Sequence, residues 1–200
     1  HCALAAVDGL LYAIGGYTNA ALPWIASGAV YAYYPPTDEW ESRTPMIFAR
    51  GEHCAVTFEG RIYVVGGNDE IGYDMAEVEV YDPALNTWSL VSSMPTARHH
   101  PGVAVLDSLI YVAGGRTGYW GQTLTLVPVV EAYSPASDTW YSLPDMMTPR
   151  SALSAAAYNG RFYTFGGEIP GIYAEAEEYD PVNSTWRRLT PMLTARHGTS

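Results

Sequence analysis

Short apolar runs recur along the chain, and each of them ends at a pair of glycines. The runs are Leu10–Ile14, Arg61–Val65, Leu109–Ala113 and Arg161–Phe165. Each is rich in aliphatic and aromatic residues and is too short for a typical helix, so each predicts a β-strand. A further apolar stretch precedes each run, as in Cys54–Phe58 and Gly102–Leu106. An acidic or amide residue, followed by glycine in three of the four cases, separates the two stretches and predicts a hairpin turn.

A second pair of strands follows each double glycine. A tyrosine lies seven residues, and a proline five residues, before each of four tryptophans. Because proline has no N–H to donate, it predicts the end of a third strand, and the tryptophan then lies on a fourth. No helical periodicity of convincing length is present, so we expect an all-β fold. The tryptophans are Trp40, Trp88, Trp140 and Trp186.

These patterns form four copies of one unit. The double glycines begin at residues 15, 66, 114 and 166, and an arginine follows every tryptophan by ten residues: Arg50, Arg98, Arg150 and Arg196. The first three arginines each precede the next double glycine by 16 residues, whereas 24, 21, 25 and 19 residues separate the second glycine from the tryptophan. Paired strands tolerate no insertion without a slip in register, so the length variation belongs to the connection between the second and third strands.

A repeated four-stranded unit of about 50 residues resembles the kelch repeat family. The stretches Arg61-Ile-Tyr-Val-Val-Gly-Gly67 and Val80-Tyr-Asp-Pro-Ala-Leu-Asn-Thr-Trp88 carry the resemblance most clearly. It implies a kelch-type β-propeller with four blades of four antiparallel strands. Kelch rings usually close with five to seven blades, so we expect an incomplete ring, a segment of a longer propeller. The expected single segment, 1–200, has blades at about 1–49, 50–97, 98–149 and 150–196, and a further blade starts at 197–200.

The recurring residues are best explained by architecture. Tryptophans and tyrosines at a fixed phase are expected to fill the apolar layer between neighbouring blades. The recurring arginines are expected to pair with Glu79, Glu131 and Glu177, because a buried arginine needs a local partner. Tyr31 occupies the corresponding position in the first unit, so that pair should be missing there.

Charge and composition exclude several partners. The net charge is −11, from 21 acidic and 10 basic residues, and all ten basic residues are arginine. Nucleic acid and anionic lipid surfaces are therefore poor partners. No apolar run approaches the roughly 18 residues needed to cross a bilayer, so we expect no membrane insertion. Two cysteines cannot form a disulfide framework.

Binding residues are expected on the variable connections, which emerge at the same end of each blade as the link to the next one. Aromatic residues outside the repeat phase are typical of recognition surfaces. The alternative is that Trp24 and Trp120 pin their own loops. The off-phase aromatics are Tyr17, Trp24, Tyr73, Tyr119, Trp120 and Tyr173.

The resemblance adds further candidates. In kelch proteins that recognise peptides, the two residues after this arginine and those just after the double glycine commonly contact the ligand. Family members that bind acidic peptides have arginine and serine at those places, and this chain mostly does not, so an acidic partner is not expected. By position the candidates are Gly51, Glu52, His99, His100, Ser151 and Ala152, together with Tyr17, Asn19, Asn68, Arg116 and Glu168.

All five histidines follow a repeat arginine or its equivalent position, which raises the question of a metal site. They show no fixed ligand spacing, so we expect neither a metal nor a cofactor. The chain has no nucleophile elbow and no phosphate-binding loop. We therefore expect a non-catalytic module that binds a protein, a peptide or a carbohydrate, with remaining propeller blades or self-association as further contacts. The alternative is a carbohydrate-active propeller enzyme, similar to sialic acid mutarotases or to galactose oxidase; in the mutarotase-like case Glu52, Arg116, Glu168 and nearby histidines would act as acid–base residues.

Overall fold

The structure is a computed structural model that describes residues 1–19, 24–118 and 123–198. The described residues form strands and turns and contain no helix, which confirms the all-β prediction. The chain divides into two compact units, His1–Ala97 and Arg98–Ser200, here called unit 1 and unit 2. Each unit contains two four-stranded antiparallel sheets.

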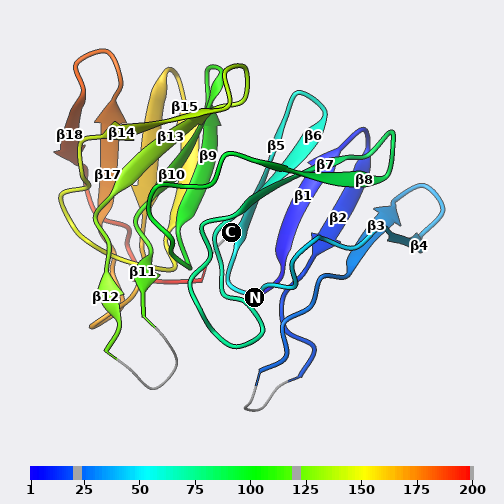
Figure 1. The fold of residues 1–200 in the computed structure, drawn as a ribbon. Coiled ribbons are helices and arrows are strands. Elements are labelled where there is room, and N and C mark those ends of the chain that lie inside the picture. The colour runs from blue at the N-terminus through cyan, green and yellow to red at the C-terminus, as the bar shows by residue number, and fades with distance from the viewer. Residues whose placement is uncertain (20–23, 119–122, 199–200) are drawn as a thin grey trace. The chain divides into compact units, whose positions relative to one another are not determined.

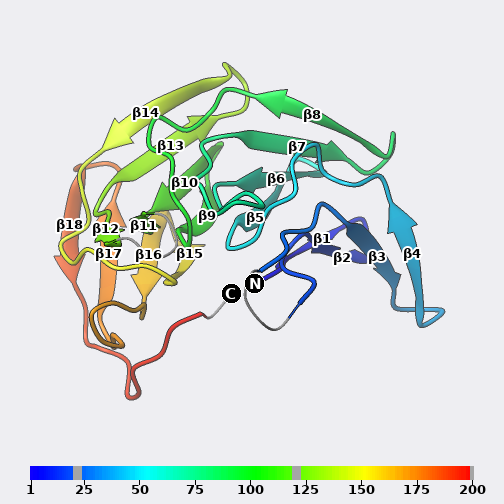
Figure 2. The same cartoon turned by 60° about the horizontal axis from the view of Figure 1, so that its bottom comes forward.

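In unit 1 both sheets are meanders, with each strand hydrogen-bonded to the next along the chain (Figure 1). The strands of the first sheet follow chain order from one edge to the other (Figure 2). The first sheet contains β1 (Ala3–Val7), β2 (Leu10–Ile14), β3 (Val30–Tyr34) and β4 (Glu39–Arg43), and the second contains β5 (Cys54–Phe58), β6 (Arg61–Val65), β7 (Val78–Asp82) and β8 (Thr87–Val91).

Unit 2 repeats this arrangement and adds a small two-stranded ribbon within one connection. Its first sheet contains β9 (Gly102–Leu106), β10 (Leu109–Ala113), β13 (Val130–Ser134) and β14 (Thr139–Leu143), its second contains β15 (Ser154–Tyr158), β16 (Arg161–Phe165), β17 (Ala176–Asp180) and β18 (Thr185–Arg188), and the ribbon pairs β11 (Arg116–Thr117) with β12 (Thr125–Leu126). The six strand ranges expected from the sequence coincide with β2, β5, β6, β9, β10 and β16, so those predictions are confirmed.

Tight turns close both hairpins of each sheet. The turn from the first to the second strand has a positive φ at its acidic or amide residue, as in Asp8 at 52°, and the following Gly9 has a φ of 78°. The turn from the third to the fourth strand is held by the tyrosine of the third strand. The Tyr81 hydroxyl donates to Asn86 Oδ1 at 2.7 Å, and burial raises the pKa of Tyr81 to about 12, so the hydroxyl keeps its proton. Tyr33 and Tyr133 donate in the same way to Asp38 and Asp138.

The two sheets of unit 1 pack face to face through an apolar layer. Tyr12 of β2 and Tyr81 of β7 lie in it with their ring centroids 5.8 Å apart. Trp88 packs against the same cluster, and its indole N–H donates to the carbonyl of Thr44 at 2.8 Å. A fourth-strand tryptophan therefore links its sheet to the preceding one, as expected.

Unit 2 is built in the same way. Tyr111 stacks on Phe162 at 5.3 Å, and the Trp186 indole donates to the carbonyl of Pro144 at 2.8 Å. The same tryptophan contact is made in both units. The tryptophan therefore occupies a constant position in its strand.

Trp40 lies in the first sheet of the chain and is not packed between the two sheets of unit 1. Side chains alternate between the two faces of a strand, and the register pairs Leu11, Tyr33 and Trp40 on one face of the first sheet and Tyr12 and Ala32 on the other. The Tyr12 face packs against the β5–β8 sheet, so Trp40 faces away from it and is 59% exposed.

Candidate functional site

The bases of the variable connections are fixed by a repeated contact with the arginine segment. In unit 1 the N–H of Gly16 donates to the carbonyl of Arg50 at 2.9 Å, and a Cβ on Gly15 would lie 2.9 Å from the same oxygen. A side chain at Gly15 would also be strained, because its φ is 59°. In unit 2 the N–H of Gly115 donates in the same way to Arg150, at 3.0 Å. The double glycine thus lets the arginine segment approach closely.

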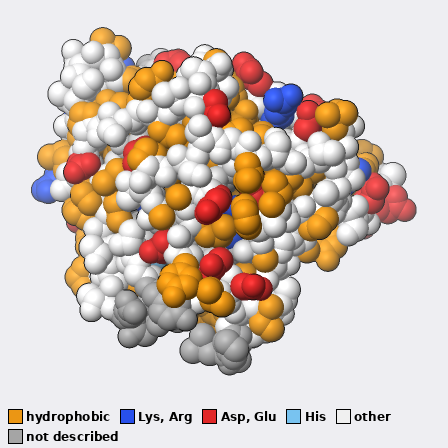
Figure 3. Space-filling model, viewed as in Figure 1, with side chains coloured by type: hydrophobic (Ala, Val, Ile, Leu, Met, Phe, Trp, Pro, Cys, Tyr) orange, Lys and Arg blue, Asp and Glu red, His pale blue; other side chains and the backbone are white. Residues whose placement is uncertain are grey.

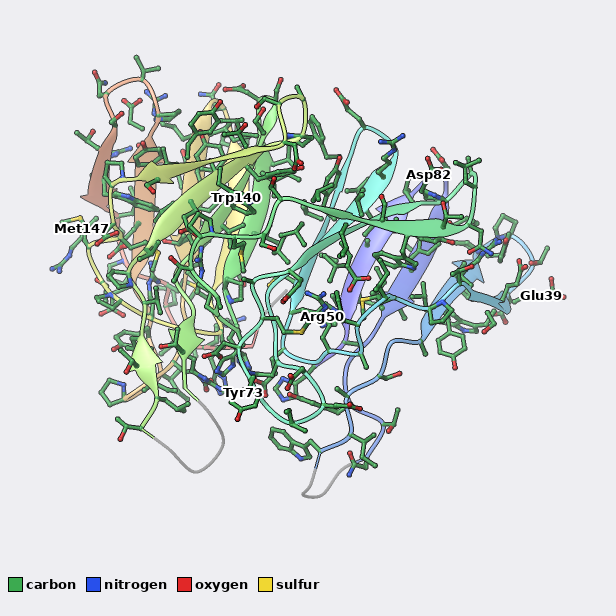
Figure 4. All side chains as sticks on the ribbon, viewed as in Figure 1. Glu39, Arg50, Tyr73, Asp82, Trp140 and Met147 are labelled. Atoms are coloured by element: carbon green, nitrogen blue, oxygen red, sulfur yellow. The ribbon has the colours of Figure 1, made fainter. Side chains whose placement is uncertain are left out.

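Arg50 then extends into the interior of unit 1 (Figure 4). Its guanidinium donates to the carbonyls of Gly66 and Glu77, at 3.0 and 2.8 Å, and to the Glu79 carboxylate at 2.6 Å. Both charged side chains are fully buried. Burial lowers the pKa of Arg50, and the Glu79 charge opposes that shift. The expected arginine–glutamate pairing is confirmed, and it joins the start of the β6–β7 connection to its end.

Unit 2 contains two more of these pairs. Arg98 donates to Glu131 at 2.6 Å, whereas Arg150 lies 3.5 Å from Glu177. All four side chains are buried. In the first sheet of unit 1, Tyr31 occupies the glutamate position and is exposed, in agreement with the expectation that the pair is missing there.

The first variable connection of unit 1 packs on itself. The rings of Tyr17 and Trp24 lie 5.1 Å apart, and Tyr17 covers Gly51, where a side chain would collide with its ring. Asn19 Oδ1 accepts the N–H of Ile25 at 2.8 Å. These contacts favour the interpretation in which Trp24 pins its own loop.

The second variable connection of unit 1 is anchored by Asn68. Its backbone exchanges hydrogen bonds of 3.0 and 2.9 Å with Gly51, and its side chain donates to the carbonyl of Gly72 at 3.1 Å. Asn68 is buried and supports the loop from within, and Glu52 is buried as well. Tyr73 lies at the far end of the same connection and is exposed; Figure 4 shows it on the opposite side of Arg50 from Asp82.

Unit 2 brings Arg116 and Glu168 together with two further polar residues. Arg116 Nη1 lies 2.5 Å from Glu168 Oε1 and donates to Ser151 Oγ at 3.2 Å. His197 Nδ1 lies 2.9 Å from the other oxygen of Glu168. Ser151 is buried, and Arg116 and Glu168 are partly exposed. The cluster offers a carboxylate held between two nitrogen donors, which suits the binding of a polar ligand.

The other candidates of unit 2 are His99, His100 and Tyr173, and His99 exchanges backbone hydrogen bonds with Arg116 of this cluster. His99 and His100 contact each other with their Nδ1 atoms 2.8 Å apart, and the N–H of Ala152 donates to the carbonyl of His100. The Tyr173 hydroxyl donates to the carbonyl of Ile169 at 2.9 Å. Tyr119 and Trp120 lie outside the described residues.

Sequence reasoning missed the aliphatic residues at the ends of these connections. It weighed only aromatic residues there, although an aliphatic side chain among Gly, Asp and Pro is also a signal of exposed apolar surface. Together with Tyr73, these aliphatic side chains at the loop tips are 39% to 58% exposed. The five residues are Ile25, Ile71, Tyr73, Leu124 and Ile172.

Two further features of the described residues concern metal-ligating side chains and membrane-spanning helices. Within either unit taken alone, no three His, Cys, Asp or Glu side chains in the described ranges bring ligand atoms within 4.8 Å of one another. No helix long and apolar enough to span a membrane occurs in the described part of the chain.

Comparison with known proteins agrees with the repeat pattern and the four-stranded sheets. The model of the KLHDC2/KLHL20/DRC7 Kelch-repeats domain matches residues 1–200. The chain belongs to the kelch repeat family. Its sheets are kelch blades, and the 200 residues hold an incomplete kelch-type propeller.

Individual kelch proteins show how much of a longer chain these blades correspond to. The chain is 31% identical over 158 residues to human Kelch-like protein 23, covering 79% of this chain and 27% of that protein. It is 28% identical over 162 residues to alpha-scruin of Limulus polyphemus, covering 78% of this chain and 18% of that protein. The solved structure of YjhT matches with a TM-score of 0.79 at 17% identity, covering 98% of this chain and 66% of that one. The kelch blades described here thus span about a quarter or less of these two curated relatives.

Proposed function

We propose that this chain is a non-catalytic kelch binding module whose variable connections bind a protein or peptide partner. One observation carries the proposal. The connections from the second to the third strands hold apolar side chains exposed at their tips, while their bases are fixed by buried repeat residues.

A fixed base matters because binding costs the entropy of ordering mobile groups. Loops that are already held by hydrogen bonds lose less freedom when a partner binds, so more of the contact energy appears as affinity. Exposed aliphatic and aromatic side chains on such loops are typical of the centre of a protein interface. Membership of the kelch family and the strongly negative net charge favour a protein partner over nucleic acid.

The test begins with a displayed library of random peptides, from which those that bind the intact chain are selected. The selected peptides are then measured against a variant carrying Ile25→Ser, Ile71→Ser, Tyr73→Ser and Ile172→Ser. The matched control carries Leu85→Ser and Val182→Ser, which remove exposed aliphatic side chains at turns between third and fourth strands, at the opposite end of the sheets.

We expect the loop-tip variant to lose most of the binding and the control to retain it, with both variants keeping the unfolding midpoint of the parent chain. Equal binding to the parent and to the loop-tip variant would count against the proposal, as would a library that yields no binder.

A second candidate is a carbohydrate-active enzyme, and the Arg116, Glu168 and His197 cluster favours it. A carboxylate beside a histidine is able to act in proton transfer if a sugar hydroxyl comes within reach. Exchange between sugar anomers, followed by NMR with the parent chain and with Glu168→Gln, separates the two functions. Exchange that depends on Glu168 would establish the enzyme, and exchange at the uncatalysed rate would remove it.

A further inference from the structure

A groove in unit 1 lies beside the second variable connection. It has a volume of about 480 Å³ and runs between residues 47–49, which follow β4, and the β6–β7 connection. Its apolar lining includes Ile47, Phe48 and Ile71, whose side chains are all exposed.

Both walls of the groove are held by hydrogen bonds within unit 1. On one side, the N–H groups of Ile47 and Phe48 donate to the buried Glu79 carboxylate, at 2.6 and 3.3 Å. On the other side, Asp69 Oδ1 accepts the N–H groups of Ile71 and Tyr73, at 3.0 and 2.9 Å. The carboxylate that pairs with Arg50 therefore also fixes one wall of the groove.

The charged residues that line the groove are all acidic: Asp69, Glu70, Asp74 and Glu77. The carboxylates of Glu70 and Glu77 form no hydrogen bond or ion pair with the described part of the chain, so their charge remains available to a ligand. Figure 3 shows carboxylates interspersed with hydrophobic side chains over the β6–β7 connection. The groove thus combines an exposed apolar lining with four acidic side chains, of which Glu77 also interacts electrostatically with the buried Arg50.

Unit 2 shows that the fold does not require acidic residues at the positions of Asp69 and Glu70. Counted from the double glycine, the positions of Asp69 and Glu70 are occupied in unit 2 by Ile169 and Pro170. Arg50 and Arg150 nevertheless donate to the carbonyls of equivalent residues, Gly66 and Gly166, so an arginine holds the start of both connections. The acidic character at positions 69 and 70 is therefore not part of the repeat framework, whereas Glu77 has a counterpart in Glu175.

We propose that this groove binds a peptide segment in which arginine or lysine alternates with aliphatic residues, presented by a partner protein. The apolar lining would bury the aliphatic side chains, and the carboxylates of Glu70 and Glu77 would pair with the basic ones. The inference rests on the proposed function, and it specifies the chemistry of the partner.

The probe is a short fluorescein-labelled peptide of alternating leucine and arginine, and its binding is followed by fluorescence anisotropy. Glu70→Gln combined with Glu77→Gln removes two carboxylates from the groove without changing side-chain size. The matched control, Glu39→Gln combined with Glu59→Gln, removes the same charge from exposed positions outside the groove. We expect the groove variant to bind about tenfold more weakly, since two exposed ion pairs contribute about 1 to 2 kcal/mol together. The control should bind like the parent.

Two more comparisons test the apolar part and the sign of the charge. Ile71→Ser should weaken binding, whereas Leu85→Ser should not. A peptide with glutamate in place of arginine should not bind. Equal weakening in the groove and control variants, or equal binding of the glutamate peptide, would overturn the proposal.

The peptides selected from the random library separate this inference from the proposed function. If they need the loop tips but bind the Glu70→Gln, Glu77→Gln variant unchanged, the groove proposal fails and the binding function stands. If no selected peptide needs the loop tips, the function itself fails.

Discussion

Arg150 donates to the hydroxyl of Thr164 at 2.7 Å, and this hydrogen bond distinguishes its sheet from the other two that bury an arginine. Val64 and Val112 occupy the equivalent position in those sheets, and there the guanidinium binds its glutamate at 2.6 Å. In unit 2 the Arg150 to Glu177 distance is 3.5 Å, and neither carboxylate oxygen of Glu177 has a hydrogen-bond partner in the described residues. One hydroxyl therefore redirects the arginine at the expense of its buried partner.

Thr164→Val should return Arg150 to Glu177. The substitution removes one hydrogen bond but allows a buried carboxylate to gain one, so we expect the free energy of unfolding to stay within about 1 kcal/mol of the parent or to rise. Urea unfolding measures the change. A loss of about 2 kcal/mol or more would show that the hydroxyl contact is the better partner.

Breaking the pair in unit 1 should be far more costly. Arg50→Met leaves the Glu79 charge buried without its partner, and we expect a loss of about 3 to 5 kcal/mol in the free energy of unfolding. Adding Glu79→Leu should recover part of that loss only, because Glu79 also accepts the N–H groups of Ile47 and Phe48. Arg61→Gln is the control: its pair with Asp82 is solvent-exposed, and its loss should cost below about 1 kcal/mol.

The strands were predictable because local rules and the repeat period agree. Turns with a positive φ at residues such as Asp8 and Asn86 mark the hairpins in the sequence itself. The constant spacing of 16 residues from an arginine to the next double glycine has a counterpart in the structure, since the guanidinium groups of Arg50 and Arg150 donate to the carbonyls of Gly66 and Gly166. A contact that recurs with the repeat leaves a constant spacing, so the sequence displays it.

The site was less predictable because it depends on contacts between segments that are distant in the chain. Asn68 and Ser151 follow the family pattern for ligand contact, yet both are buried, since each pairs its backbone or side chain with the adjoining loop. The groove depends on Glu79 holding the N–H groups of Ile47 and Phe48, more than 30 residues away in the chain. The repeat pattern places Glu79 beside Arg50, but it does not indicate that the same carboxylate accepts the N–H groups of Ile47 and Phe48.

Trp88 and Trp40 provide a matched pair for measuring the layer between sheets. Trp88→Ala removes both the packing against the unit 1 core and the hydrogen bond to Thr44, so we expect a loss of about 2 to 3 kcal/mol, somewhat below the range for a fully buried aromatic residue. Trp40→Ala should cost below about 1 kcal/mol because the ring is mostly exposed. Equal losses in urea unfolding would contradict the assignment of the two environments.

The face that carries Trp40 should promote self-association of this chain. Leu4, Leu11, Tyr31 and Trp40 lie on the same face of the β1–β4 sheet and are 45% to 63% exposed. A contiguous apolar face of this kind favours contact with another apolar surface. Sedimentation velocity should show concentration-dependent dimers that decrease in Leu11→Ser combined with Trp40→Ala, and not in Leu85→Ser. A parent chain that stays monomeric at all concentrations would contradict this prediction.

His53 should make the stability of unit 1 depend on pH. Its ring is buried with Nε2 3.1 Å from the carbonyl of Ile14, and burial, together with the nearby Arg50 charge, lowers the pKa of His53 to about 3. The unfolded chain has the ordinary histidine pKa near 6.5, so between pH 6.5 and 3 the unfolded state binds a proton that the folded state does not. The free energy of unfolding should therefore fall by about 1.4 kcal/mol per pH unit as the pH decreases through this window. His53→Gln keeps a donor for Ile14 and should remove that slope, whereas the carboxylates titrate equally in both proteins. Parallel curves of unfolding free energy against pH for the parent and His53→Gln would show that His53 titrates normally in the folded chain.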